Sequence, residues 1–165
     1  MAAVQKSSVD FDRDPRSIVG EREFDAPRDL VFAAFADPKH LAQWWGPNGF
    51  TTTTSQFEFR PGGVWRHVMH GPDGRDYQNR ITFEQIVRPE RIVFRHGGGA
   101  DVEPVQFRQT VVFEDLGGGR TRIVWRQDYP SAAERDRIAK EYGAAEGMAQ
   151  CLARLAEFVA THGAA

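Results

Sequence analysis

Between residues 50 and 129 the chain alternates short segments rich in β-branched and aromatic residues with turns built from glycine and proline. Consecutive strands joined by such tight turns form an antiparallel meander. The pattern therefore predicts a single sheet of at least six strands in this region. The expected strands are Phe50–Phe59, Val64–His70, Tyr77–Val87, Arg91–His96, Val105–Glu114 and Thr121–Tyr129.

One long amphipathic helix follows this run of strands. Its apolar positions recur at helical spacing and fall on one face, and they are Met148, Cys151, Leu152, Leu155, Phe158 and Val159. Such a helix must bury that face against the sheet. A strongly twisted antiparallel sheet can curl around it. We therefore expect a cavity wherever the curled sheet and the helix do not meet tightly.

The segment before the meander contains one strand and two short helices. Ser17–Phe24 alternates in polarity as a strand does, and Pro27 suits the first turn of a helix. Asp37 followed by Pro38 is typical of a second helix start, with Asp37 as the N-cap. Residues 1–15 are polar and show no period, which predicts a disordered N-terminal arm before a single domain over residues 16–165.

The final helical region carries its own start and break signals. Ser131 and Glu134 form a capping box, and Gly143 then interrupts the helical pattern. We interpret Gly143 as a boundary between two helices and Gly147 as room for a close contact with the sheet. The alternative is a hinge that lets the last helix lift to admit a ligand.

Composition and charge exclude several classes of function. The formal net charge is −2, which does not favour a nucleic-acid partner or an anionic membrane surface. Cys151 is the single cysteine, so no intramolecular disulfide forms, as is usual in a reducing compartment. No secretory signal and no membrane-spanning apolar run is recognisable. The expected location is cytoplasmic.

Several short motifs occur in a fixed order along most of the chain. They are Arg22-Glu23-Phe24-Asp25-Ala26-Pro27, Trp44-Trp45-Gly46-Pro47, Arg60-Pro61-Gly62-Gly63, Gly71-Pro72-Asp73-Gly74 and Glu141-Tyr142-Gly143-Ala144-Ala145-Glu146-Gly147. In these motifs the sequence resembles bacterial single-domain proteins similar to the activator of heat-shock protein 90 ATPase. The resemblance implies an α+β helix-grip fold of the START-like (SRPBCC) superfamily, with a curved antiparallel sheet wrapped around a long C-terminal helix.

Strand periodicity selects the side chains that face the last helix. In Val64–His70, for example, Trp65, His67 and Met69 share one face. Concave faces that mix aromatic rings with a few polar groups are typical of small-molecule pockets, although a filled core with paired polar groups fits the same pattern. The candidate ligand-binding residues are Trp44, Trp45, Trp65, His67, Met69, Tyr77, Asn79, Phe94, His96, Trp125, Gln127, Tyr129, Met148, Cys151, Leu152 and Leu155.

The adjacent tryptophans have two possible roles. Trp44 and Trp45 either form one lip of a pocket or plug one end of the core.

The sequence shows no recognisable metal or catalytic motif. His67 and His70 lie three apart on a strand, so they face opposite sides and cannot share a metal ion. Cys151 sits within an apolar stripe, which indicates an inert thiol. We expect no metal, no cofactor and no catalytic residue.

Three hypotheses for function remain. The first is a binding module that holds a small hydrophobic molecule, oriented by polar side chains such as His67, His96 and Gln127. The second is a cyclase-like or aromatase-like enzyme with His67 or His96 as a general acid or base. The third is a protein-interaction domain like the co-chaperone. That co-chaperone carries an additional N-terminal domain with no counterpart here, which argues against a chaperone partner; a homodimer is compatible with the sequence.

Overall fold

The computed structural model describes residues 7–10, 14–98 and 101–162. The elements are β1 (Ser7–Asp10), β2 (Ser17–Phe24), α1 (Arg28–Ala33), α2 (Pro38–Trp44), β3 (Thr51–Phe57), β4 (Val64–His70), β5 (Asp76–Val87), β6 (Arg91–His96), β7 (Phe107–Gly117), β8 (Arg120–Asp128), α3 (Ala132–Tyr142) and α4 (Ala144–His162). No helix within the described ranges is long and apolar enough to cross a membrane.

The strands form one eight-stranded antiparallel sheet in the order β1-β2-β8-β7-β6-β5-β4-β3. The meander expected from the turn pattern is confirmed, because each strand from β3 to β7 pairs with the next strand along the chain. Strand β2 extends the sheet beyond the meander by pairing with β8, from Ser17 opposite Asp128 to Phe24 opposite Thr121. The chain therefore has the expected helix-grip α+β fold.

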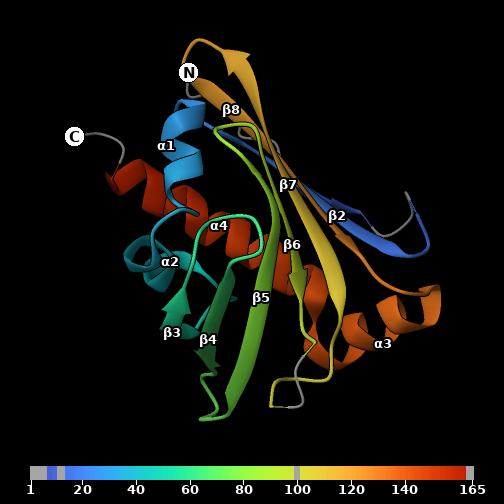
Figure 1. Ribbon diagram of the computed structural model, residues 1–165. Coiled ribbons are helices and arrows are strands. Elements are labelled where there is room, and N and C mark those ends of the chain that lie inside the picture. The colour runs from blue at the N-terminus through green and yellow to red at the C-terminus, as the bar shows by residue number, and fades with distance from the viewer. Residues whose placement is uncertain (1–6, 11–13, 99–100, 163–165) are drawn as a thin grey trace.

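The long helix α4 lies across the concave side of the sheet (Figure 1). Its apolar stripe is buried as the spacing predicts: Leu152 and Leu155 are fully buried, whereas Glu157 on another face is exposed. The stripe belongs to one hydrophobic core that runs from Ile18 to Val159. Burial of this stripe positions α4 relative to the strands and sets the space left between them.

Helix α4 comes close to the sheet at a glycine. A methyl group on Gly20 of β2 would collide with the Met148 side chain of α4 and would also crowd Leu152. Glycine in a strand often marks such a close approach. At this end of the sheet, helix and strand therefore pack without a gap.

The N-terminal segment differs from the sequence prediction. Residues 1–15 were expected to be disordered, but Ser7–Asp10 form β1 and pair with β2, with Val9 opposite Gly20. This segment shows no alternating pattern because backbone hydrogen bonds to a sheet edge require little from the side chains. Residues 1–6 and 11–13 lie outside the described part of the chain.

The two glycines near the last helix have different roles. Gly143 takes a left-handed conformation with φ of 62° and caps α3, so the predicted boundary between two helices is confirmed. Gly147 does not face the sheet as expected. A methyl group there would approach Pro47, in the loop after α2, to 3.3 Å. The close approach to the sheet is instead made from the strand side, at Gly20.

Candidate functional site

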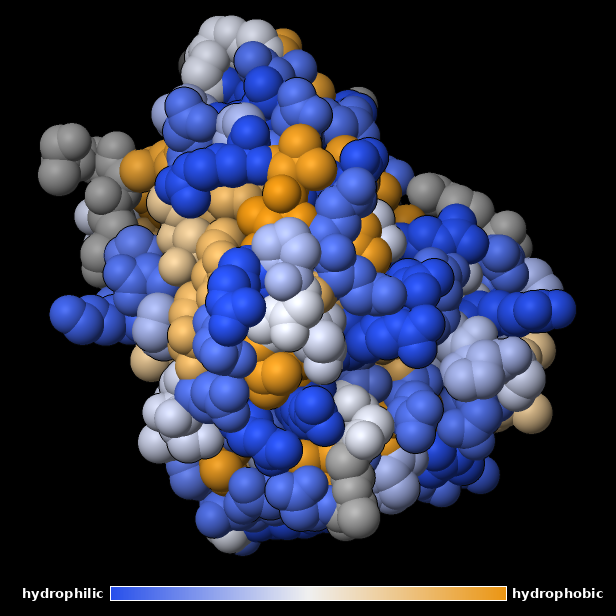
Figure 2. All heavy atoms as spheres, in the orientation of Figure 1, coloured by the Kyte–Doolittle hydropathy of each residue, from blue (hydrophilic) through white to orange (hydrophobic). Residues whose placement is uncertain are grey.

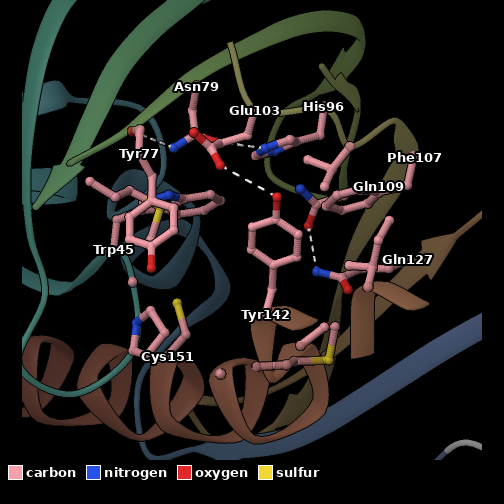
Figure 3. Close-up of a pocket in the computed structure, with 18 of the residues that line it drawn as sticks. Trp45, Tyr77, Asn79, His96, Glu103, Phe107, Gln109, Gln127, Tyr142 and Cys151 are labelled. Carbon is pink, nitrogen blue, oxygen red and sulfur yellow. Dashed lines mark hydrogen bonds between the residues drawn. The ribbon is translucent and has the colours of Figure 1, made fainter. Parts of the chain in front are cut away.

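A cavity of about 250 Å³ lies between the concave face of the sheet and helices α3 and α4. Figure 3 shows side chains from the strands and from α3 and α4 converging on it. The residues that line it are Trp45, Gly46, Pro47, Phe50, Met69, Tyr77, Asn79, His96, Glu103, Val105, Phe107, Gln109, Trp125, Gln127, Tyr129, Ile138, Glu141, Tyr142, Ala144, Gly147, Met148 and Cys151.

Most of the residues singled out from the sequence surround this cavity. Those that line it are Trp45, Met69, Tyr77, Asn79, His96, Trp125, Gln127, Tyr129, Met148 and Cys151. The remaining candidates lie outside the lining, in the core behind it: Trp44, Trp65, His67, Phe94, Leu152 and Leu155. Strand periodicity places Trp65, His67 and Phe94 on the concave face, and helical periodicity places Leu152 and Leu155 on the buried stripe, but neither pattern says how far the empty space extends.

The adjacent tryptophans take one each of the two roles that the sequence left open, a plug of the core and a wall of the pocket. Trp44 is fully buried and its indole nitrogen donates to the carbonyl oxygen of Ala34 over 3.0 Å, so it plugs the core under α1. Trp45 lines the cavity and stacks obliquely on Trp125, with ring centroids 5.6 Å apart. One residue is therefore structural and its neighbour forms part of the cavity wall.

His67 is a buried histidine without a hydrogen-bond partner among the described residues. Its ring stacks on Trp65 with centroids 4.0 Å apart, and neither ring nitrogen finds a partner. Burial lowers the pKa of His67 well below its usual range, so the ring is neutral at physiological pH. A neutral, sealed imidazole acts here as a flat packing surface.

His96 has a defined partner at the cavity wall. Its Nε2 atom lies 2.8 Å from Oδ1 of Asn79, whose amide nitrogen donates to the carbonyl oxygen of Tyr77. Because that amide nitrogen is the donor, Oδ1 must accept, and His96 therefore carries its proton on Nε2. Burial lowers the pKa of His96 to about 4. The Phe107 ring stacks on it at 4.8 Å.

A second polar chain crosses β7 and β8. The Tyr129 hydroxyl donates to Oε1 of Gln127 over 2.8 Å, and Nε2 of Gln127 donates to Oε1 of Gln109 over 3.1 Å. Trp125 donates its indole N–H to the same oxygen of Gln109 over 2.7 Å. Gln109 was not among the sequence candidates. The alternation of Gln109 with Val111 and Phe113 on β7 could have identified it, since these residues share the concave face.

Contacts between three separate segments border the mouth of the cavity. Glu103, which precedes β7, accepts from Arg75 over 2.9 Å and from the Tyr142 hydroxyl over 3.4 Å. The guanidinium of Arg75 lies 4.3 Å over the Tyr77 ring. Glu103 and Tyr142 were also missed from the sequence, because loop contacts of this kind leave no periodic signal.

The cavity wall is uncharged in its depth. Of the described ionisable residues that line it, the carboxylates are Glu103 and Glu141, and none is an arginine or a lysine. Burial raises the pKa of the Cys151 thiol to about 11 and raises the pKa of Tyr129 above its usual range, so both stay protonated. No group of three or more His, Cys, Asp or Glu residues within the described ranges is placed to hold a metal ion.

Comparison with known proteins places this fold in a family. Residues 25–160 match the family described as activator of Hsp90 ATPase homolog 1-like protein. The chain belongs to this family. No curated protein matches the chain. The resemblance of the sequence motifs is thus confirmed by a match that spans most of the helix-grip domain.

Solved structures of bacterial proteins share the architecture of this family member. A protein from Arthrobacter aurescens is 30% identical, with a TM-score of 0.85 over 93% of this chain and 91% of that one. Protein Ms6760 from Mycobacterium smegmatis is 26% identical, with a TM-score of 0.81 over 93% and 97%. The AHSA1 protein from Silicibacter pomeroyi is 23% identical, with a TM-score of 0.71 over 88% and 98%, a likeness that shows the fold.

The surroundings of His96 in the cavity differ from those expected of a general acid or base. A general acid or base works best with a pKa near the working pH, whereas burial depresses the pKa of His96 to about 4. A cavity histidine paired with a carboxylate would have favoured an enzyme, but His96 pairs with the Asn79 amide. The pair between His70 and Asp76 lies on the exposed side of the sheet, away from the cavity.

Proposed function

We propose that this protein is a binding module that holds a small, mostly apolar and uncharged molecule between its sheet and α4. The cavity of about 250 Å³ carries the proposal. Protein interiors are otherwise packed to the density of organic crystals. A space of this size lined by aromatic rings leaves those rings without contacts on one side, and an apolar ligand supplies them.

The size and wall of the cavity limit the class of ligand. Its volume is close to the lower end of the roughly 300–1,000 Å³ of ligand pockets, which suits a molecule of about two fused rings. The aromatic side chains of Trp45, Trp125 and Phe107 line it. A planar aromatic ligand can stack on these rings at little cost in conformational freedom.

The outer face of the sheet gives less support to a protein-interaction role. Arg95 of β6 and Arg108 of β7 both pair with Glu84 there, and all three side chains are substantially exposed. In the orientation of Figure 1, hydrophilic residues cover most of the visible surface and hydrophobic ones occur in smaller groups between them (Figure 2). A broad exposed apolar patch is the usual mark of a docking surface.

The proposal is tested with a neutral fluorophore of two fused rings, 1-aminonaphthalene, and two matched substitutions on α4. Ala144 lines the cavity, whereas Ala160 lies on the exposed side of the same helix. We expect Ala144→Phe to weaken probe binding by about tenfold or more, because the ring fills the space, and Ala160→Phe to leave it unchanged. Denaturation of the freshly purified protein should release a small apolar compound, which mass spectrometry then detects.

Two results would overturn the proposal. The first is that the folded wild-type protein does not bind the probe. The second is equal probe affinity in a folded Ala144→Phe variant, which would place the probe outside the cavity. In either case the outer face of the sheet would become the surface to examine.

A further inference from the structure

The orientation of the Gln109 amide is fixed by its neighbours. The indole nitrogen of Trp125 can only donate a hydrogen bond, so the Gln109 atom 2.7 Å from it is the oxygen. Nε2 of Gln127 also donates to that oxygen. Both of these bonds would be lost if the amide were turned around. The other atom of the Gln109 amide is therefore the NH₂ group.

That NH₂ group is directed at the cavity and its two hydrogens are unused. Gln109 lines the cavity and is 1% exposed. Figure 3 shows its oxygen turned toward Gln127 and its nitrogen on the other side of the amide. No described residue accepts from this nitrogen, and it is not among the atoms sealed inside the wall, in contrast to Nδ1 of His96. A buried donor left without an acceptor is costly, so this site suits a ligand that supplies one.

The chain of hydrogen bonds strengthens this donor. Tyr129 donates to Gln127 and Gln127 donates to Gln109, so each bond runs in the same direction. Aligned hydrogen bonds polarise one another. A carbonyl oxygen suits the end of such a chain best, because it has two lone pairs and brings no donor of its own that would need a partner.

The charge of the wall excludes one kind of carbonyl compound. Within the part of the chain that the structure describes, no arginine or lysine lines the cavity, whereas Glu103 and Glu141 do. A carboxylate ligand would lose its hydration without gaining a cation from the wall, because the neighbouring Arg75 and Arg137 are already paired with Glu103 and Glu141. The preferred ligand therefore carries a neutral carbonyl.

We propose that the cavity selects an uncharged aromatic carbonyl compound, such as an aryl ketone, whose oxygen accepts a hydrogen bond from Nε2 of Gln109. The inference rests on the proposed function and specifies its ligand class. Gln109 is then the residue that fixes the orientation of the ligand, while the aromatic wall supplies the contact area.

Three ligands of nearly equal shape test the inference on the wild-type protein. They are 2-acetylnaphthalene, 2-isopropenylnaphthalene, in which a CH₂ group replaces the carbonyl oxygen, and 2-naphthoate, which is ionised at about pH 7.5. Binding is followed by quenching of Trp45 and Trp125, which line the cavity. We expect the ketone to bind about tenfold more tightly than the alkene, and the carboxylate to bind more weakly than both.

The Gln109→Met variant tests the residue itself, with Gln78→Met on the exposed side of β5 as the matched control. The preference for ketone over alkene should disappear in Gln109→Met and persist in Gln78→Met. In ketone labelled with ¹³C at the carbonyl, the carbonyl resonance of the bound ligand should lie further downfield in wild type than in Gln109→Met. If Gln109→Met does not fold, the preference for ketone over alkene in the wild-type protein still decides the matter.

The outcomes separate this inference from the proposed function. If none of the three ligands binds, the proposed function itself fails. If ketone and alkene bind wild type equally, or if folded Gln109→Met keeps the preference, the binding module stands and the role of Gln109 is overturned. Equal or tighter binding of 2-naphthoate would overturn the requirement for a neutral ligand.

Discussion

Arg154 of α4 donates through Nη1 to the carbonyl oxygen of Gly46, over 2.9 Å. The same nitrogen donates to the carbonyl oxygen of Pro47 over 3.0 Å. Gly46 and Pro47 follow α2 and line the cavity next to Trp45. A single guanidinium thus ties the loop that forms one wall of the cavity to the helix that forms another. The sequence places Arg154 outside the apolar stripe of this helix and does not predict its contacts with the loop.

Replacing Arg154 should loosen this wall. We expect Arg154→Met to lower the free energy of unfolding by about 1–3 kcal/mol, because backbone carbonyls lose a charged donor. Probe affinity should fall as well, since Trp45 and Pro47 are no longer held. Arg154→Lys, which keeps the charge but not the planar fork, should be intermediate on both measures. Denaturant unfolding and probe titration of the two variants check this, and wild-type values for Arg154→Met would refute it.

The buried stripe of α4 makes a second prediction. Leu155 is fully buried, whereas Glu157 on the same helix is exposed. Leu155→Ala should destabilise the protein by about 2–5 kcal/mol, the usual range for a buried leucine. Glu157→Ala should change stability by less than about 0.5 kcal/mol. Urea unfolding with equal midpoints for the two variants would contradict the packing of α4.

The sequence predicts the fold well and the site only in outline, for physical reasons. Turn glycines and prolines and the apolar stripe of α4 act locally, so the meander and the helix are readable. Whether a concave residue lines the cavity depends on how far the sheet curls, which distinguishes Met69 from His67 on β4. The mouth contacts of Glu103 depend on loop positions, and β1 depends on a free sheet edge, so neither leaves a pattern.

Neutral buried histidines should make stability depend on pH. Burial lowers the pKa of His96 to about 4 in the folded state, against about 6.5 in an unfolded chain. Between these values the unfolded state binds more protons, so stability rises with pH and falls on acidification. The titration of His96 alone should lower the free energy of unfolding by about 2 kcal/mol between pH 7 and pH 5. His67, whose pKa is lowered well below its usual range, adds in the same direction.

Removal of the titrating ring provides the control for this prediction. In His96→Phe the aromatic stack on Phe107 can remain, while the proton-binding group is lost. The free energy of unfolding of this variant, measured by denaturant at pH 7, 6 and 5, should fall less steeply than that of wild type. An identical slope in both proteins would show that His96 takes up its proton without unfolding.

Contacts at the cavity mouth should control how fast a ligand enters and leaves. Glu103 joins Arg75, at the start of β5, to Tyr142, at the end of α3, and its side chain is 17% exposed. Glu103→Ala removes both contacts without filling or emptying the deep part of the cavity. We expect the association and dissociation rates of the probe to rise together, each by roughly tenfold, with little change in the equilibrium affinity.

The matched control for the mouth lies two residues away on the same segment. Asp101 pairs with Arg66 on the exposed side of the sheet and does not line the cavity. Asp101→Ala should therefore leave both rates unchanged in a stopped-flow measurement, whereas Glu103→Ala accelerates them. Equal rates in wild type and Glu103→Ala would mean that the ligand enters elsewhere. Acceleration by both substitutions would instead assign the effect to the whole segment before β7, and the specific contact of Glu103 with Tyr142 would lose its role.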